Sequence, residues 1–167
     1  RMSRLIDEIK KYQEGFKQKA PIEIQNIMLS ATKKLQDQSI SKNALKVGDI
    51  VKEFKLPNAV SKEISLSEVL ENNDFAIVSF YRGVWCAYCN FELKALQEKN
   101  EEFKALGAQL IAISPQSPDA SMTTKEKNEL EFEVLSDHNN IIAKEFGLVF
   151  SLAEELRPIY KSFNIDI

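Results

Sequence analysis

The chain has 167 residues, with 22 basic and 25 acidic side chains, a formal net charge of −3 and 44% hydrophobic residues. This length fits one domain with a sizeable core, and the composition is that of a soluble globular protein, not a disordered or fibrous one. The charges form no basic block, so we expect no nucleic-acid partner. The apolar runs at residues 75–81 and 110–113 are too short to cross a bilayer, so we expect no membrane partner.

The first forty residues predict two amphipathic helices, because apolar side chains recur there at steps of three and four. These are Leu5, Ile6, Ile9, Tyr12 and Phe16, and then Ile24, Ile27, Met28, Ala31 and Leu35. We interpret residues 1–40 as an N-terminal helical hairpin that extends the main domain. It carries no reactive side chain, so we read it as a packing or dimerisation element, and a homodimer is one arrangement left open.

The next segment predicts a short hairpin over residues 47–58, with turns at Gly48–Asp49 and Pro57–Asn58. Ser65 and Glu68 form a capping-box pattern that opens a short helix. Residues 75–81 then read as a buried strand. A helix should follow from about residue 90 to residue 106, ended by Gly107.

The remaining segments continue the alternation of strands and helices. Residues 109–114 and 132–135 are apolar and predict strands, whereas residues 123–130, 139–146 and 153–163 predict helices. Strands that alternate with helices favour right-handed parallel crossovers. The sequence therefore predicts an α/β fold.

The only two cysteines, Cys86 and Cys89, lie at the junction of a predicted strand and a predicted helix. Unpaired backbone N–H groups and the positive end of the helix dipole favour a thiolate there. Cysteines in such places have a pKa of roughly 3.5–7.5, against about 8.5 when free. We expect Cys86 to be the nucleophile and Cys89, one turn inward, to close a disulfide with it.

Three neighbours of the cysteines are candidate site residues. Trp85 should shield the sulfur of Cys86 from bulk water. Tyr81 and Arg82, at the end of the strand, should line the approach, and Arg82 could also favour the thiolate through its charge.

Other roles for the cysteine pair have to be weighed. A structural zinc site takes four ligands, and His138 is the only further soft candidate. No histidine follows Cys89, which excludes c-type haem attachment, and the five glycines form no phosphate-binding loop. We therefore expect no metal and no cofactor. Two buried structural thiols stay open as an alternative.

The remaining polar candidates have ordinary structural interpretations. His138 fits a surface turn or cap, Asp137 a loop or cap position, and Arg157 an exposed or salt-bridged side chain. Two cysteines in a chain without a visible leader sequence favour a cytoplasmic location, where such pairs are more often catalytic than structural.

With these residues in view, the chain resembles the AhpC/TSA branch of the thioredoxin-like superfamily, the peroxiredoxin-like proteins, over residues 45–165. The resemblance is carried by residues 47–49, 54–57, 79–93, 112–116, 126–128 and 134–137. It implies a thioredoxin-like domain over residues 44–167 that reduces a peroxide substrate at Cys86. The resulting sulfenic acid would condense with a second thiol, and thioredoxin or a similar dithiol would reduce the disulfide.

The chain departs from the peroxiredoxin pattern in three ways. Residues 81–85 contain neither the proline nor the threonine or serine that peroxiredoxins carry before the peroxidatic cysteine. Trp85 and Cys89 are more similar to the redox loop of thioredoxin. The sequence stops at Ile167, so we expect a thioredoxin-like fold that lacks its C-terminal strands and helix, unless a neighbouring subunit completes the sheet.

A thiol-dependent peroxidase is therefore the leading interpretation. A thiol–disulfide oxidoreductase of the thioredoxin type is the second, because a Cys-X-X-Cys pair also exchanges with protein disulfides. A redox-inactive thioredoxin-like module that binds partners through its N-terminal helices is the third.

Overall fold

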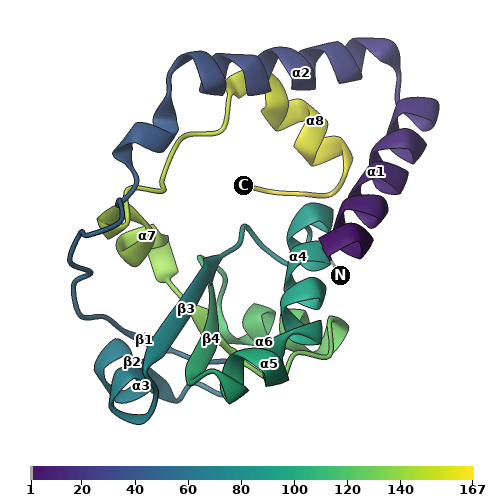
Figure 1. The fold of residues 1–167 in the computed structure, drawn as a ribbon. Helices are drawn as coiled ribbons and strands as arrows, with labels where there is room; N and C mark the ends of the chain where they lie inside the picture. The colour runs from purple at the N-terminus through teal and green to yellow at the C-terminus, as the bar shows by residue number, and fades with distance from the viewer. Residues whose placement is uncertain (1) are drawn as a thin grey trace. The chain divides into compact units, whose positions relative to one another are not determined.

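The structure, a computed structural model, describes residues 2–167 (Figure 1). The chain forms two compact units, which are described separately below. We call residues 48–146 the sheet unit, and residues 1–47 together with 147–167 the helical unit. The proposed division into an extension over residues 1–40 and a thioredoxin-like domain over residues 44–167 stays a prediction.

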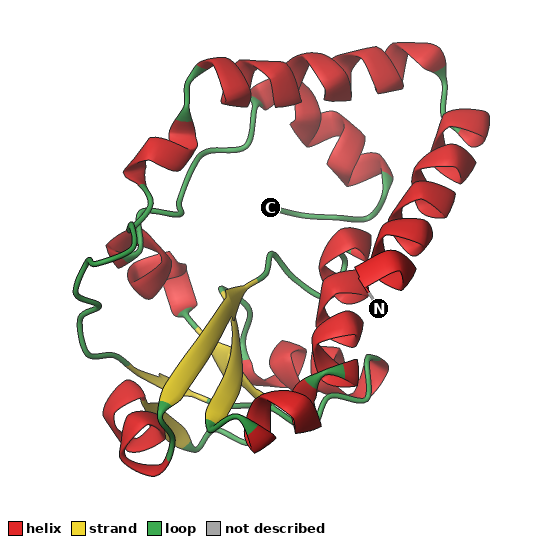
Figure 2. Cartoon of the chain, viewed as in Figure 1, coloured by secondary structure: helices red, strands yellow, loops and turns green. Residues whose placement is uncertain are grey.

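The helical unit contains helices and loops only in its described residues (Figure 2). Its elements are α1 (Met2–Lys19), α2 (Ile22–Asp37), the 3-10 helix η1 (Ile40–Asn43), the 3-10 helix η3 (Glu154–Leu156) and α8 (Arg157–Ser162). The two N-terminal helices confirm the periodicity of the apolar side chains. The helix that the sequence predicts over residues 153–163 is present as η3 followed directly by α8.

The sheet unit alternates strands and helices, as the sequence predicts. Its elements are β1 (Lys55–Pro57), β2 (Glu63–Ser65), α3 (Leu66–Asn72), β3 (Phe75–Phe80), α4 (Ala87–Glu98), α5 (Asn100–Ala105), β4 (Ala108–Ser114), α6 (Pro118–Lys127), β5 (Glu133–Ser136), the 3-10 helix η2 (His138–Asn140) and α7 (Ile141–Glu145). The single helix expected from about residue 90 to residue 106 is instead divided into α4 and α5, which Lys99 separates.

The three longest strands form a parallel sheet in the order β3-β4-β5. The central strand β4 pairs with β3 through Ile111 and Val78, and with β5 through Ile113 and Leu135. Parallel neighbours need crossover connections, and here helices supply them (Figure 1). The predicted α/β class and the parallel crossovers are confirmed.

The parallel sheet has a buried cluster on each of its two faces, and successive side chains of β4 point to opposite faces. Leu110 and Ala112 pack with Leu93 of α4 on one face. Ile111 and Ile113 pack with side chains of β1, α3 and β5 on the other. All four β4 residues are almost fully buried. Both faces of a parallel sheet are thus covered, which explains why β4 reads as a continuous apolar run.

The predicted hairpin over residues 47–58 is wrong in its position. The observed hairpin joins β1 to β2 through residues 58–62, so the expected turn at Pro57–Asn58 joins the strands and the one at Gly48–Asp49 does not. Asn58 determines this turn, because its side-chain oxygen accepts hydrogen bonds from the backbone N–H groups of Val60 and Lys62, at 3.0 and 2.9 Å. An asparagine side chain that bonds the following backbone groups stabilises such a turn.

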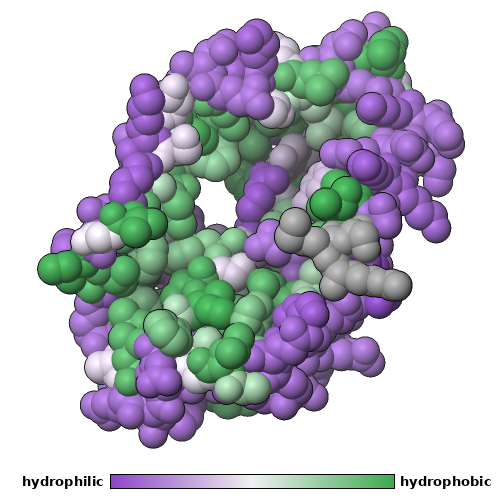
Figure 3. Space-filling model, in the orientation of Figure 1, coloured by the Kyte–Doolittle hydropathy of each residue, from purple (hydrophilic) through white to green (hydrophobic). Residues whose placement is uncertain are grey.

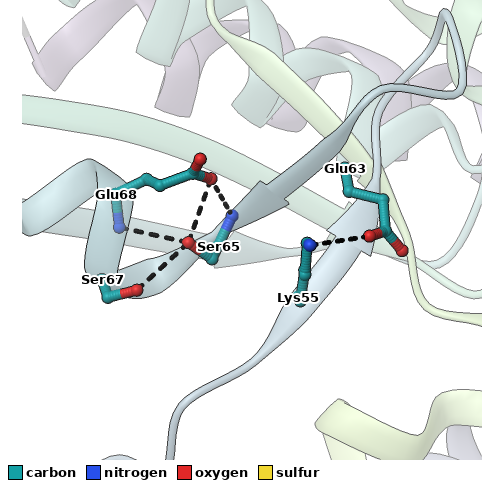
Figure 4. A network of polar contacts seen from close by, with 5 residues as sticks. All are labelled: Lys55, Glu63, Ser65, Ser67 and Glu68. Atoms are coloured by element: carbon teal, nitrogen blue, oxygen red, sulfur yellow. Dashed lines mark hydrogen bonds and ion pairs between the residues drawn. The ribbon is translucent and has the colours of Figure 1, made fainter.

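The predicted capping box at Ser65 is confirmed and starts α3 (Figure 4). The Ser65 hydroxyl accepts a hydrogen bond from the backbone N–H of Glu68, and the Glu68 carboxylate accepts one from the N–H of Ser65, at 3.2 and 3.1 Å. The Ser65 hydroxyl also donates to the Glu68 carboxylate at 3.0 Å. The donation from the Ser65 N–H, and then that from its hydroxyl, lower the pKa of Glu68 below its ordinary value of 4.5. Lys55 and Glu63 form an ion pair on the neighbouring hairpin at 2.9 Å.

Glu68→Gln should lower the stability of the sheet unit at neutral pH and lose this effect in acid. A lowered pKa in the folded state stabilises the fold above the ordinary pKa, and this contribution disappears as the pH falls through the folded value. Urea unfolding at about pH 7 and about pH 3 measures the difference. Glu71→Gln, on the same helix, is the control, and equal effects of both variants at neutral pH would contradict a stabilising role of the Glu68 charge.

In the helical unit, α2 packs against the C-terminal segment. Ala31 of α2, Leu156 and Ile159 form a small buried cluster, and Lys34 pairs with Glu155 at its edge at 2.5 Å. The outward side of α1 seen in Figure 3 is mainly hydrophilic, in agreement with its amphipathic pattern. The apolar stripe of α2 is therefore used for packing within this unit.

Gly147 allows two segments of the helical unit to touch. Its φ of +69° lies in the left-handed region, which glycine adopts without a steric penalty. A methyl group at this position would overlap the carbonyl oxygen of Asn43. The contact between residue 147 and residues 43–44 thus requires glycine for two independent reasons.

Gly147→Ala should destabilise the helical unit by about 2 kcal/mol or more, through backbone strain and steric overlap. Thermal unfolding followed by far-UV circular dichroism measures this loss. Gly15→Ala in α1 is the matched control, because a methyl group there meets no atom within 4 Å and should raise helix stability. An unchanged unfolding temperature for Gly147→Ala would refute the packing argument.

Within residues 2–167, no helix combines the length and the apolar character needed to span a membrane.

Candidate active site

The loop between β3 and α4 ends at Cys86, and Cys89 lies in the first turn of α4. We call residues 81–86 the redox loop. The strand is continued at the start of this loop, where Tyr81 N–H donates to the Ile113 carbonyl at 2.9 Å. A turn then forms, in which Cys86 N–H donates to the Gly83 carbonyl at 3.0 Å. The helix begins directly after this turn.

Cys86 is the N-cap residue of α4, with φ −85° and ψ 105°. Its sulfur accepts a hydrogen bond from the backbone N–H of Cys89 at 3.3 Å. A sulfur at this place takes up one of the N–H groups that a helix start leaves unpaired, which favours negative charge on it. The predicted position of Cys86 at a helix N-terminus is confirmed.

The two cysteines are joined as a disulfide, with their Cα atoms 5.3 Å apart. Cys86 is 5% exposed, whereas Cys89 is half-buried and packs against the core cluster around Leu93. The structure therefore brings together the predicted pair, at the spacing of one helical turn. The assignment of Cys86 as nucleophile and Cys89 as resolving thiol stays a prediction.

Arg82 and Trp85 lie against each other beside the disulfide. The guanidinium carbon of Arg82 lies 4.6 Å from the centre of the Trp85 ring, within range of a cation–π interaction. Gly83 makes room for this ring, since a methyl group there would come within 2.5 Å of the Trp85 indole nitrogen. The absence of a side chain at residue 83 thus fixes where Trp85 can lie.

Tyr81 differs from Arg82 and Trp85 in its surroundings. It is 7% exposed and belongs to the core cluster that contains Leu93 and Leu110. Its buried hydroxyl has no hydrogen-bond partner among the residues that the structure describes. Tyr81 thus packs into the core at the base of the redox loop, and the expected role in lining the approach stays a prediction.

The backbone of Val84, two residues before Cys86, is held by side chains from other segments. Its N–H donates to the side-chain oxygen of Gln116 at 3.2 Å. Its carbonyl accepts from the side-chain amide of Asn90 at 2.9 Å and from the Lys127 ammonium at 3.4 Å. Both polar groups of this loop residue are therefore satisfied by side chains outside the loop, two of which, Gln116 and Lys127, are distant in sequence.

Asn90 is in turn bonded to Asn128. The Asn128 amide donates to the Asn90 side-chain oxygen at 2.9 Å and to the Thr124 carbonyl at 3.0 Å. Asn90 and Asn128 are 8% and 4% exposed, and Thr124 is fully buried. We call the side chains of Asn90, Gln116 and Asn128 the loop-holding amides.

Sequence reasoning did not identify the loop-holding amides as functional residues. Gln116 and Asn128 lie in segments 112–116 and 126–128, which carried the family resemblance. That resemblance was the available signal, because a single polar residue on a helix or loop gives no periodic pattern that would show where its side chain bonds.

The other polar candidates have structural partners or are exposed. The Asp137 carboxylate accepts from the N–H groups of Ile142 and Ala143 at 3.0 and 2.9 Å, which confirms its cap role. Arg157 pairs with Glu154 in the helical unit, and His138 is exposed. No three His, Cys, Asp or Glu side chains gather as metal ligands within the described residues.

Residues 47–166 match the AhpC/TSA family, and the chain belongs to this family. The predicted membership is therefore confirmed, with a match that covers most of the chain. This family lies within the thioredoxin-like class, whose strand–cysteine–helix arrangement is the one described above.

Individual relatives give the same indication. The chain is 36% identical over 104 residues to the putative peroxiredoxin bcp of Buchnera aphidicola. The aligned region covers 62% of the chain and 65% of that relative. It is 28% identical over 106 residues to peroxiredoxin Bcp of Escherichia coli, covering 64% and 67%. The crystal structure of peroxidoxin BcpB from Mycobacterium tuberculosis superposes with a TM-score of 0.58 at 25% identity, covering 62% and 66%. The chain thus spans about two thirds of these relatives.

Gly83→Ala should displace Trp85, because the added methyl group and the indole ring cannot both occupy the space. We expect a loss of stability of about 1–3 kcal/mol and a shifted fluorescence emission. Trp85 is the only tryptophan, so the emission spectrum reports on this loop alone. Gly15→Ala should leave the emission unchanged. A Gly83→Ala spectrum identical to that of the parent protein would show that the ring does not depend on residue 83.

Proposed function

We propose that this protein is a thiol-dependent peroxidase that reduces hydrogen peroxide or organic hydroperoxides through Cys86 and Cys89. One observation carries the proposal: in a chain of the AhpC/TSA family, Cys86 caps a helix and is within disulfide reach of Cys89. Relatives named as peroxiredoxins support the same activity. The slight exposure of Cys86 favours a small substrate over a protein disulfide.

The proposed reaction has three steps. The Cys86 thiolate attacks one peroxide oxygen, so that an S–O bond forms, the O–O bond breaks, and the leaving oxygen takes a proton to become an alcohol or water. The Cys89 thiol then attacks the Cys86 sulfenic acid, an S–S bond forms, and water leaves. Thioredoxin or a similar dithiol reduces this disulfide by exchange and supplies two electrons and two protons.

The geometry assigns a physical contribution to each neighbour in this proposal. The N–H of Cys89 and the start of α4 stabilise the Cys86 thiolate. Arg82 lies over the ring of Trp85, the residue that directly precedes Cys86. Peroxide cleavage needs no metal or organic cofactor in this scheme, since the thiolate supplies the electrons.

A thiol–disulfide oxidoreductase is the competing function, because the same Cys-X-X-Cys pair could exchange with protein disulfides. Insulin reduction by a dithiol distinguishes the two activities, since an oxidoreductase accelerates it and a peroxidase with a secluded sulfur does not. A redox-inactive binding module is distinguished by mass spectrometry, because only an active pair loses about two mass units on mild oxidation.

Cys86→Ser should abolish peroxide reduction, with a loss of at least about a hundredfold, because the nucleophile is removed. Cys89→Ser should consume one equivalent of peroxide and then stop as a sulfenic acid. Stopped-flow oxidation with hydrogen peroxide measures both variants, and a sulfenic-acid trap detects the intermediate.

The proposal fails if the parent protein reacts with peroxide no faster than a free thiol of the same thiolate fraction. Equal activity of Cys86→Ser and Cys89→Ser would also contradict the assigned order of attack. The cytoplasmic location and the homodimer stay predictions, and size-exclusion chromatography with light scattering tests the latter.

A further inference from the structure

Asn90 holds the chain on both sides of the Trp85–Cys86 segment. Its backbone N–H donates to the Cys86 carbonyl at 3.0 Å, which is the first hydrogen bond of α4. Its side-chain amide donates to the Val84 carbonyl at 2.9 Å. A single residue of the helix thus fixes the carbonyl of the cysteine and the carbonyl two residues before it.

The second contact depends on which way the Asn90 amide points. An asparagine side chain can rotate so that its oxygen and nitrogen exchange places, and only one orientation donates to Val84. Asn128 selects that orientation, because it offers a donor to the Asn90 oxygen at 2.9 Å. Asn128 is itself fixed by its second donation, to the Thr124 carbonyl of α6.

These bonds matter most after the disulfide is reduced. In the oxidised protein a covalent bond fixes both sulfur atoms, whatever the surrounding hydrogen bonds do. In the dithiol form, the place of Cys86 depends on the turn from Gly83 and on the contacts of Val84. If the Val84 carbonyl were released, the loop could rotate, and the Cys86 sulfur could lose the N–H of Cys89.

We propose that Asn90 and Asn128 are positioning residues for the nucleophile: Asn128 orients the Asn90 amide, and Asn90 holds the redox loop so that Cys86 stays at the N-terminus of α4. This inference rests on the proposed function, in which Cys86 is the attacking thiolate. Among the described residues, neither side chain is hydrogen-bonded to the Cys86 sulfur. Asn90 acts through the backbone of Val84, and Asn128 acts through Asn90.

The variants that test this proposal leave every charged side chain near the redox loop in the protein. Arg82 stacks on Trp85, Lys127 contacts the Val84 carbonyl, and Glu92 accepts from Ser79 one turn beyond Cys89. Substitution of a neutral asparagine by alanine alters none of these charges. A change in the ionisation of Cys86 would therefore report a change in its position relative to the helix start.

The experiment measures the ionisation of Cys86 without reference to peroxide. In a Cys89→Ser parent, Cys86 is the only thiol, and its alkylation by iodoacetamide is followed between about pH 4 and pH 10. Asn90→Ala in this parent should raise the midpoint by about one pH unit and slow alkylation about tenfold below it. The plateau rate at high pH should stay the same, because the thiolate itself is unaltered.

Asn128→Ala should shift the midpoint in the same direction by a smaller amount. The double variant should shift no further than Asn90→Ala alone, because Asn128 acts through Asn90. Asn100→Ala is the matched control, since Asn100 is also a buried asparagine, 1% exposed, but lies in α5. Its midpoint should equal that of the parent.

Circular dichroism tests whether each variant is folded. If Asn90→Ala does not fold, the midpoint of Asn128→Ala alone decides the outcome. Midpoints that equal the parent value, or a shift of the same size in Asn100→Ala, would overturn the proposal. Additive shifts in the double variant would overturn the indirect role of Asn128.

The two proposals can fail separately. Unshifted midpoints together with rapid peroxide consumption by the parent protein would remove the positioning role and leave the peroxidase. Shifted midpoints in a protein that does not reduce peroxide would remove the peroxidase and leave the positioning role.

Discussion

Val84 lies where β3 has ended and α4 has not begun, so its backbone N–H and C=O cannot bond within either element. Buried backbone groups without partners are costly, and here the loop-holding amides supply the partners. Burying amide side chains is itself unfavourable, but within the described residues their fully buried polar atoms are bonded, with the exception of the Asn128 oxygen. The cysteine turn is thus a local structure that depends on long-range polar contacts.

Much of the sheet unit could be predicted from the sequence, because its strands and helices are coded locally. The apolar runs at β3 and β4 and the capping pattern at Ser65 each depend on residues close in sequence. The position of Cys86 followed from the same local order of strand, turn and helix. Local signals of this kind need no knowledge of which distant segments meet.

The rest could not be predicted, because it depends on contacts between distant segments. Alternation over residues 47–58 predicted turns at both Gly48–Asp49 and Pro57–Asn58, but it could not show that only the second turn joins two strands, β1 and β2. The bond from Asn128 to Asn90 spans 38 residues and leaves no trace in periodicity. The contact of Arg82 with Trp85 is local, but it depends on the space at Gly83, which apolar periodicity does not reveal.

The small core of the helical unit contains residues from the first part of the chain to be translated and residues from the last part. Ala31 of α2 has to meet Leu156 and Ile159, which follow more than a hundred residues further along the chain. At synthesis rates of about 5–20 residues per second, the apolar stripe of α2 waits roughly 6–25 s on the ribosome for its partners. During translation this helix therefore lacks its C-terminal partners for that interval, while the sheet unit that contains the cysteines can fold in the meantime.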